Sequence, residues 1–204
     1  MPREKLTKRK IQGRETRQKL FETSIALFNE RGYENVTIDD ICEKIGVSKG
    51  AFYTHFKSKD QVIVENFLYL NTSYEEVLGN GKAAGSAFEK LYAFQLYAMR
   101  KLEEIGWKAV RLVYHVETGS NKNKSFLTSK SFSLYKIILS LIKEGQKSGE
   151  IRKDQSAAAI TDTLVQLYRG IIFDWCLNNG AYSLVEAANN TAVFVFEGIR
   201  FRHP

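Results

Sequence analysis

The chain has 204 residues and a formal charge of +7 at neutral pH, from 30 Lys and Arg against 23 Asp and Glu. Apolar residues make up 44% and charged residues 26%, which is typical of a folded globular protein and excludes a wholly disordered chain. The two prolines stand at positions 2 and 204, so everything between them lacks the residue that most disrupts helices and central strands. The pattern favours a succession of helices over a turn-rich β fold.

The two cysteines, Cys42 and Cys176, belong to no C-x-x-C pair, so we expect buried reduced thiols and neither a disulfide nor structural zinc. The N-terminus has no apolar signal region, and no run of 18 apolar residues exists. We therefore expect a cytoplasmic protein with no membrane contact, no metal site and no cofactor.

Positive charge gathers in two segments near the N-terminus. Residues 1–19 hold eight Lys or Arg against two Glu, and residues 44–59 hold four Lys and no acid. Two basic segments that flank a short helical unit indicate a polyanionic partner.

The first predicted helix covers residues 14–31, where Leu20, Ile25 and Phe28 recur on one face and Gly32 follows as a helix stop. The second covers 37–45: the Thr37 hydroxyl caps it, and the acid three residues later completes a capping box.

Ser48 caps a third predicted helix, which extends to about His55, and a long fourth helix begins near Ser58. Three helices thus fit within about 45 residues, with a short break that contains Gly46 between the second and third. This is the sequence form of a helix-turn-helix.

The third helix has two dissimilar faces. Phe52 and Phe56 lie four residues apart, and we expect both to pack into the core of the three-helix unit. A second face carries a cation, a glycine, a phenol and a hydroxyl, and no acid: Lys49, Gly50, Tyr53 and Thr54. An α-helix fits the DNA major groove, where such side chains bind phosphates and base edges.

The segment from Ile45 to Lys59, with Thr37-Ile38-x-x-Ile41 before it, closely resembles the DNA-binding domain of the TetR family of bacterial transcriptional regulators. The resemblance covers about residues 14–65. Further along it is weaker, with Glu144-Gly145-Gln146 followed by Gly149-Glu150-Ile151, and Arg169-Gly170. The resemblance implies an all-α homodimer: a repressor that binds a palindromic operator in double-stranded DNA and is released when a small molecule enters the C-terminal domain.

The resemblance also implies which residues contact DNA. Thr37 would bind phosphate through its hydroxyl, Lys49 and Gly50 would face the groove, Tyr53 and His55 would contact the backbone, and Lys59 would bind phosphate. Ala51 and Thr54 differ from the residues common at their positions, which affects base preference. The predicted DNA-binding set is Thr37, Ser48, Lys49, Gly50, Ala51, Tyr53, Thr54, His55 and Lys59. The basic arm Arg3 to Lys10 would add a groove or backbone contact.

The predicted domains are a helix-turn-helix domain with its basic arm over residues 1–58 and a helical ligand-binding and dimerisation domain over 59–204. Further helices are expected near 86–104, 105–118, 126–147, 155–178 and 183–200. The last two carry continuous apolar faces, which either form the core of one chain or, as the resemblance implies, a four-helix dimer interface.

A ligand pocket in the C-terminal domain would draw on aromatic side chains and cations that recur at helical spacing. The candidates are Tyr97, Arg100, Trp107, Arg111, Tyr114, His115 and Trp175. If the cations face the cavity, the ligand is anionic or aromatic; aromatic stripes of this kind also commonly form core.

Two enzyme motifs are matched formally. Gly46-Val47-Ser48-Lys49-Gly50 fits G-x-S-x-G, which requires a strand before the serine, where we expect a helix. Positions 79–84 approach a dinucleotide fingerprint without the strand it needs. We expect no enzyme. The alternative function is a helical ligand-binding protein that does not bind an operator.

Overall fold

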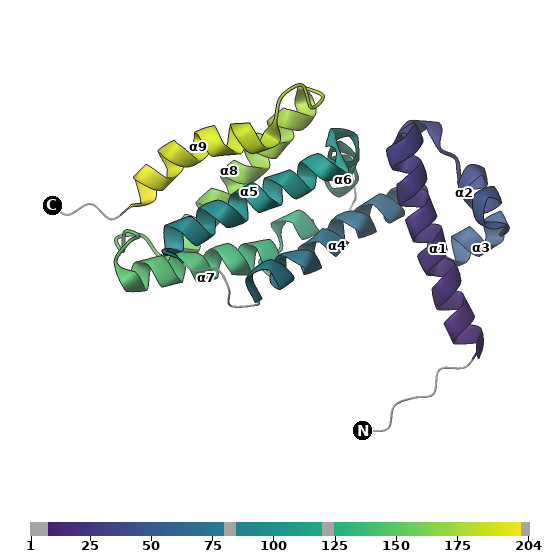
Figure 1. The fold of residues 1–204 in the computed structure, drawn as a ribbon, viewed down its shortest axis with the longest axis horizontal. Helices are drawn as coiled ribbons and strands as arrows, with labels where there is room; N and C mark the ends of the chain where they lie inside the picture. Colours follow the sequence, from purple (N-terminus) through teal and green to yellow (C-terminus); the bar gives the residue numbers. More distant parts are fainter. Residues whose placement is uncertain (1–7, 80–84, 120–124, 201–204) are drawn as a thin grey trace. The chain divides into compact units, whose positions relative to one another are not determined.

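The computed structural model describes residues 8–79, 85–119 and 125–200, and within them the fold is all-α, as predicted (Figure 1). No helix of this described part is long and apolar enough to cross a membrane. The α-helices are α1 (Lys8–Arg31), α2 (Ile38–Ile45), α3 (Lys49–His55), α4 (Lys59–Gly79), α5 (Ala87–Ile105), α6 (Trp107–Gly119), α7 (Ser133–Ser148), α8 (Ala157–Leu177) and α9 (Leu184–Ile199); the 3-10 helices are η1 (Tyr33–Asn35) and η2 (Phe126–Thr128).

The helix expected over 126–147 differs from the structure, because only η2 forms at 126–128 and α7 starts at Ser133. Between η2 and α7, and at the start of η2, serine hydroxyls accept hydrogen bonds from backbone amides. Ser125 Oγ accepts from the Leu127 amide at 3.1 Å, and Ser129 Oγ accepts from the Ser131 amide at 3.3 Å. Such local side-chain bonds compete with helical hydrogen bonding.

The chain forms two compact units, which divide within α4 after Asn66. The described residues up to Asn66 are called the N-terminal unit here, and those from Phe67 onward the C-terminal unit. The first turns of α4 belong to the N-terminal unit because their side chains bond there: Tyr33 donates to Asp60, and Arg17 pairs with Glu65.

The core of the N-terminal unit lies between α1, α2 and α3. Leu20, Ile41 and Phe52 are fully buried, and Phe56 is almost so. Gly46 ends α2 in the left-handed conformation at φ 70°, where a side chain is disfavoured, and the chain turns there into α3.

The C-terminal unit packs α5 against α7 and α9, and α8 against α6, α7 and α9 (Figure 1). Its core contains a buried polar pair: the Tyr168 hydroxyl donates to Gln95 Oε1 at 2.9 Å, and Gln95 Nε2 donates to the Ala188 carbonyl at 2.8 Å. Because buried polar groups are costly unless bonded, this chain of contacts fixes how α5, α8 and α9 meet.

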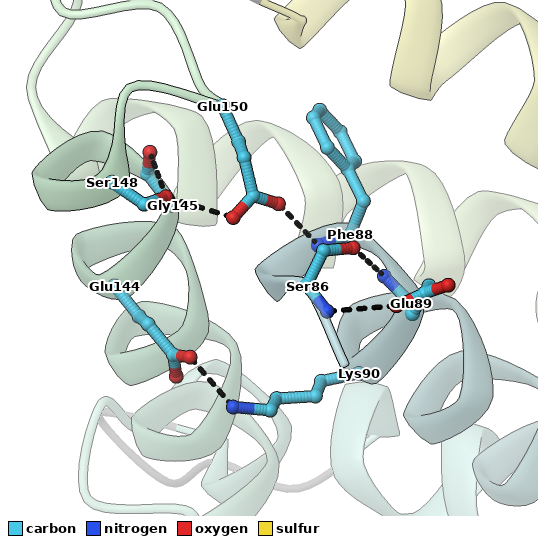
Figure 2. A network of polar contacts seen from close by, with 8 residues as sticks. All are labelled: Ser86, Phe88, Glu89, Lys90, Glu144, Gly145, Ser148 and Glu150. Carbon is cyan, nitrogen blue, oxygen red and sulfur yellow. Dashed lines mark hydrogen bonds and ion pairs between the residues drawn. The ribbon is translucent and has the colours of Figure 1, made fainter. Parts of the chain in front are cut away.

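The motif around Glu144 and Glu150 joins the end of α7 to the start of α5, and Figure 2 shows its contacts. Glu150 accepts from the Ser148 hydroxyl at 2.8 Å and from the Phe88 amide at 3.3 Å, and Lys90 pairs with Glu144 at 2.6 Å. At Gly145 an added Cβ would lie 2.5 Å from Ile151 Cδ1, so the glycine allows α7 to approach the turn closely. The motif therefore has a structural role.

Candidate nucleic-acid interface

The start of α2 is fixed by the predicted capping box. Thr37 Oγ1 accepts from the Asp40 amide at 3.1 Å, and Asp40 Oδ2 accepts from the Thr37 amide at 2.7 Å. The Thr37 hydroxyl hydrogen also goes to Asp40 Oδ2, at 2.6 Å, and these bonds lower the pKa of the Asp40 carboxyl. Because a hydroxyl has one hydrogen, Thr37 must release Asp40 before it donates to a phosphate.

Helix α3 separates its two faces as the spacing predicts. Phe52 and Phe56 are buried, whereas Tyr53 is 55% exposed and Lys49, Gly50 and Thr54 are also exposed. The Ser48 side chain caps the helix by accepting from the Ala51 amide.

The exposed groups differ in what they can still offer a partner. Thr54 Oγ1 donates to the Gly50 carbonyl at 2.8 Å, so its hydroxyl is left as an acceptor. Ser48 uses its oxygen as an acceptor and keeps its hydrogen as a donor. The Tyr53 hydroxyl has no hydrogen-bond partner among the described residues, and its ring packs edge-on against Phe52 at 5.8 Å. The hydroxyl groups of Ser48 and Tyr53 thus each keep a hydrogen that could be donated to a partner.

Ala51 and His55, the remaining α3 residues of the predicted set, are each partly exposed. Gly50 has only the Ser48 hydroxyl oxygen near it, 3.6 Å from where a Cβ would stand. An alanine therefore fits at position 50 in the free chain, and any close approach that requires glycine comes from a partner.

Lys59 is already engaged inside the N-terminal unit. Its ammonium donates to the carbonyls of Tyr33 at 2.8 Å and Val36 at 2.7 Å, and it lies 4.1 Å from the Tyr33 ring centre. An ammonium has three donors, so one is left for a phosphate. In the free chain Lys59 therefore holds the loop before α2 against α4.

Sequence reasoning missed one residue at this surface, Asp39. Its carboxylate lies 2.7 Å from Lys49 Nζ, and this hydrogen bond raises the pKa of the lysine. The absence of acid on α3 itself gave no sign of it, because Asp39 comes from α2. Of the basic arm, positions 3–7 lie outside the described residues, and positions 8–10 begin α1.

Of the seven predicted ligand-site residues, three are exposed cations and four are aromatic residues that are partly or fully buried. Arg100, Arg111 and His115 are exposed, so these cations do not line the interior. Arg111 stacks over the Trp107 ring, 4.7 Å from its centre. The prediction of an anionic or aromatic ligand depended on cations that face a cavity, and at these three positions the side chains are exposed.

The aromatic members of that set lie deeper. Tyr97 packs beside Tyr74 at 6.2 Å, and Tyr114 donates to the Arg169 carbonyl at 3.3 Å. Trp175 is 4% exposed, and its indole N–H donates to the Tyr182 carbonyl at 2.9 Å. These aromatic side chains are mainly core.

The formal nucleophile-elbow motif does not have the structure it requires, because Ser48 follows helix α2 and a turn instead of a strand. The dinucleotide-like motif at 79–84 lies almost entirely outside the described residues.

Residues 20–65 match the family model for the N-terminal domain of bacterial regulatory proteins of the tetR family, a segment that contains the whole α2–turn–α3 unit. The chain carries the N-terminal domain of the TetR family.

Relatives of the chain are transcriptional regulators. It is 23% identical over 186 residues to the probable acrEF/envCD operon repressor of Escherichia coli, a match that covers 88% of this chain and 84% of the repressor. Among solved structures, Thermus thermophilus FadR in complex with lauroyl-CoA superposes with a TM-score of 0.69 at 19% identity, over 92% of this chain and 97% of FadR. A putative regulator from Saccharomonospora viridis in complex with choline superposes with a TM-score of 0.70 at 24% identity, over 93% of this chain and 100% of the regulator.

Proposed function

We propose that the chain is a sequence-specific DNA-binding transcriptional repressor that acts as a homodimer on a palindromic operator and is released by a small molecule. One observation carries the proposal: α3 turns its apolar side chains into the core and presents Ser48, Lys49 and Tyr53 on its exposed face. A helix of this kind can enter the major groove while flanking donors bind phosphates.

In this proposal Ser48 and Tyr53 bind phosphates, because their hydroxyl hydrogens are available. Thr37 and Lys59 add backbone contacts, Thr37 after its hydroxyl turns from Asp40 and Lys59 with its third N–H. Thr54 accepts from a base amino group, since its hydroxyl hydrogen is held by Gly50. The sizes of Gly50, Ala51 and His55 determine how closely α3 approaches the DNA.

The second copy would dock on α8 and α9. Each of these helices exposes large apolar side chains: Leu177 is 63% exposed, Val193 63% and Phe194 81%. A groove of about 360 Å³ lies between them, lined in part by Leu167, Phe194 and Val195. An exposed apolar surface of this kind marks an association site. Two copies related by a twofold axis would then present two α3 helices to a palindrome.

The effector would bind inside the C-terminal unit. The related structures hold lauroyl-CoA and choline, so small ligands of different chemistry are precedents for the fold. Here the predicted cations are exposed, and Tyr97 and Tyr114 pack against a hydrophobic cluster, which favours a largely apolar ligand. Binding would shift the population of conformers toward one that does not fit the operator.

DNase footprinting of the purified protein on the DNA that flanks its own gene tests the central proposal. We expect a protected palindrome and affinity that falls steeply with salt. Deletion of residues 1–10 should lower the affinity and flatten the salt dependence. No protection at low salt would favour the alternative, a ligand-binding helical protein without an operator.

Sedimentation of Phe194→Asp tests the dimer, because a charge at this exposed position would have to be buried against the second copy. We expect dissociation at concentrations where the parent chain is dimeric, with unchanged helix content. Ser140→Asp, an exposed position on α7 and outside α8 and α9, is the matched control. Dimerisation of Phe194→Asp equal to that of the control would contradict this interface.

Lauroyl-CoA and choline are the first probes for release from DNA. We expect lauroyl-CoA to release the protein and choline to have no effect, because the interior offers apolar walls. Arg111→Ala should retain the response, whereas Tyr114→Ala should weaken it. Release by choline alone would contradict an apolar ligand site.

A further inference from the structure

The first residue of α3 is already paired with an acid from another helix. Lys49 Nζ lies 2.7 Å from Asp39 Oδ2, and the two side chains are 57% and 63% exposed. Asp39 sits in the first turn of α2. Lys49 and Asp39 together therefore have no net charge at the start of the proposed DNA-binding surface.

Such an exposed pair contributes little to folding, because solvent screens it and two flexible side chains must be held in place. An acid at this surface also repels phosphates. If Lys49 served only to attract the DNA backbone, the neighbouring carboxylate would weaken that role. The geometry instead suits a lysine that is held in one direction.

We propose that Asp39 is a specificity-determining residue that keeps its hydrogen bond to Lys49 on DNA and directs the ammonium to a base edge in the major groove. The proposal rests on the DNA-binding function proposed above. One N–H of Lys49 remains on Asp39, and two are left for the O6 and N7 acceptors of guanine. The second carboxylate oxygen can accept from a cytosine amino group.

Binding in this mode has a measurable signature. A neutral pair neutralises no phosphate and releases no counterion, so it adds nothing to the salt dependence of binding. A lysine that leaves Asp39 for a phosphate adds about 0.9 to the slope of log affinity against log salt. The two modes therefore differ in salt dependence as well as in sequence preference.

The test uses the full chain with Asp39→Asn, Lys49→Ala and the double variant. Each is titrated, at several salt concentrations, on the duplex that footprinting identifies and on a random-sequence duplex of equal length. We expect the parent and the double variant to share one slope on the random duplex, and Asp39→Asn to be steeper by about 0.9. The ratio of affinities for the two duplexes should fall roughly tenfold in Asp39→Asn and in the double variant.

Two controls separate this effect from charge and folding. Glu34→Gln removes an exposed acid of the same unit and should leave the ratio of the two duplex affinities unchanged. Asp39→Glu keeps a carboxylate at this position and should retain most of that ratio. Thermal unfolding checks that each variant is folded. The proposal is overturned if the slope of log affinity against log salt is shallower in the double variant than in the parent by about 0.9. It is also overturned if Asp39→Asn changes the affinities for the footprinted duplex and the random duplex by the same factor. A parent chain that binds neither duplex contradicts the proposed function itself.

Discussion

Helix α3 and the aromatic helices of the C-terminal unit use similar side chains in opposite ways. In α3 the adjacent residues differ: Phe52 is fully buried and Tyr53 is 55% exposed, so packing and the proposed DNA contact fall to different side chains. In the C-terminal unit Tyr168 and Trp175 are both 4% exposed, and their polar atoms bond within the protein. A short helix on a small core leaves one face free, whereas a helix inside a bundle uses its aromatic residues for the core first.

The largest expected effect comes from Phe52→Ala, which should destabilise the N-terminal unit by about 3–5 kcal/mol because it empties the centre of a small core. Thermal unfolding followed by circular dichroism would show it, together with loss of duplex binding. Tyr53→Ala should cost only about 0.5–1.5 kcal/mol, from the lost edge-on contact with Phe52, and should still weaken duplex binding. Equal destabilisation by the two variants would break the separation between packing and recognition.

Gly145→Ala tests the core of the C-terminal unit. The added methyl would stand 2.5 Å from Ile151 Cδ1 and 3.1 Å from Ala87 Cβ, so we expect a loss of about 1–3 kcal/mol in chemical denaturation. Gly170→Ala, where nothing lies within 4 Å of the added atom, should be neutral or stabilising by up to about 1 kcal/mol. Similar effects at both positions would argue against close packing at the α7 turn.

Thr37→Ala and Ser156→Ala remove equivalent caps, one in each unit. Each should cost about 1 kcal/mol, because an amide at the helix start loses its side-chain acceptor. Only Thr37→Ala should also change duplex affinity, since only Thr37 belongs to the proposed interface. A change in duplex affinity from Ser156→Ala would remove this distinction.

The smallest effect concerns Glu150 and acid. Burial raises the pKa of Glu150, but hydrogen bonds from the Ser148 hydroxyl and the Phe88 amide outweigh it and hold the pKa below its usual range. A lowered pKa gives stability that is present above the unfolded value of about 4.3 and is lost as pH falls through the folded value. Glu150→Gln should therefore lose less stability than the parent between roughly pH 5 and pH 3. Parallel pH profiles would contradict this role.

The helix-turn-helix was predictable because its signals are local. Thr37, Gly46 and Ser48 determine where α2 and α3 start and stop through bonds to their own neighbours, and the four-residue spacing of Phe52 and Phe56 sets the buried face. The boundary at Ser133 was missed because serine hydroxyls between 125 and 131 compete for backbone that has helical apolar spacing.

The exposure of the candidate ligand-site cations was not predictable in the same way. Helical spacing places Arg111 and His115 on one face of α6, but it does not say whether that face meets the core or solvent, and the structure exposes both. Periodicity indicates which residues share a face of a helix, but packing against other helices determines whether that face is buried or exposed.

The sequence by itself determined α2 and α3, their caps and the exposed donors of α3, because each depends on residues within a few positions of one another. Only the tertiary structure decided that Asp39 meets Lys49, that Lys59 bonds to the carbonyls of Tyr33 and Val36, and that Glu150 reaches the start of α5. These contacts join different elements, so their energies depend on how the helices pack, which no local pattern encodes.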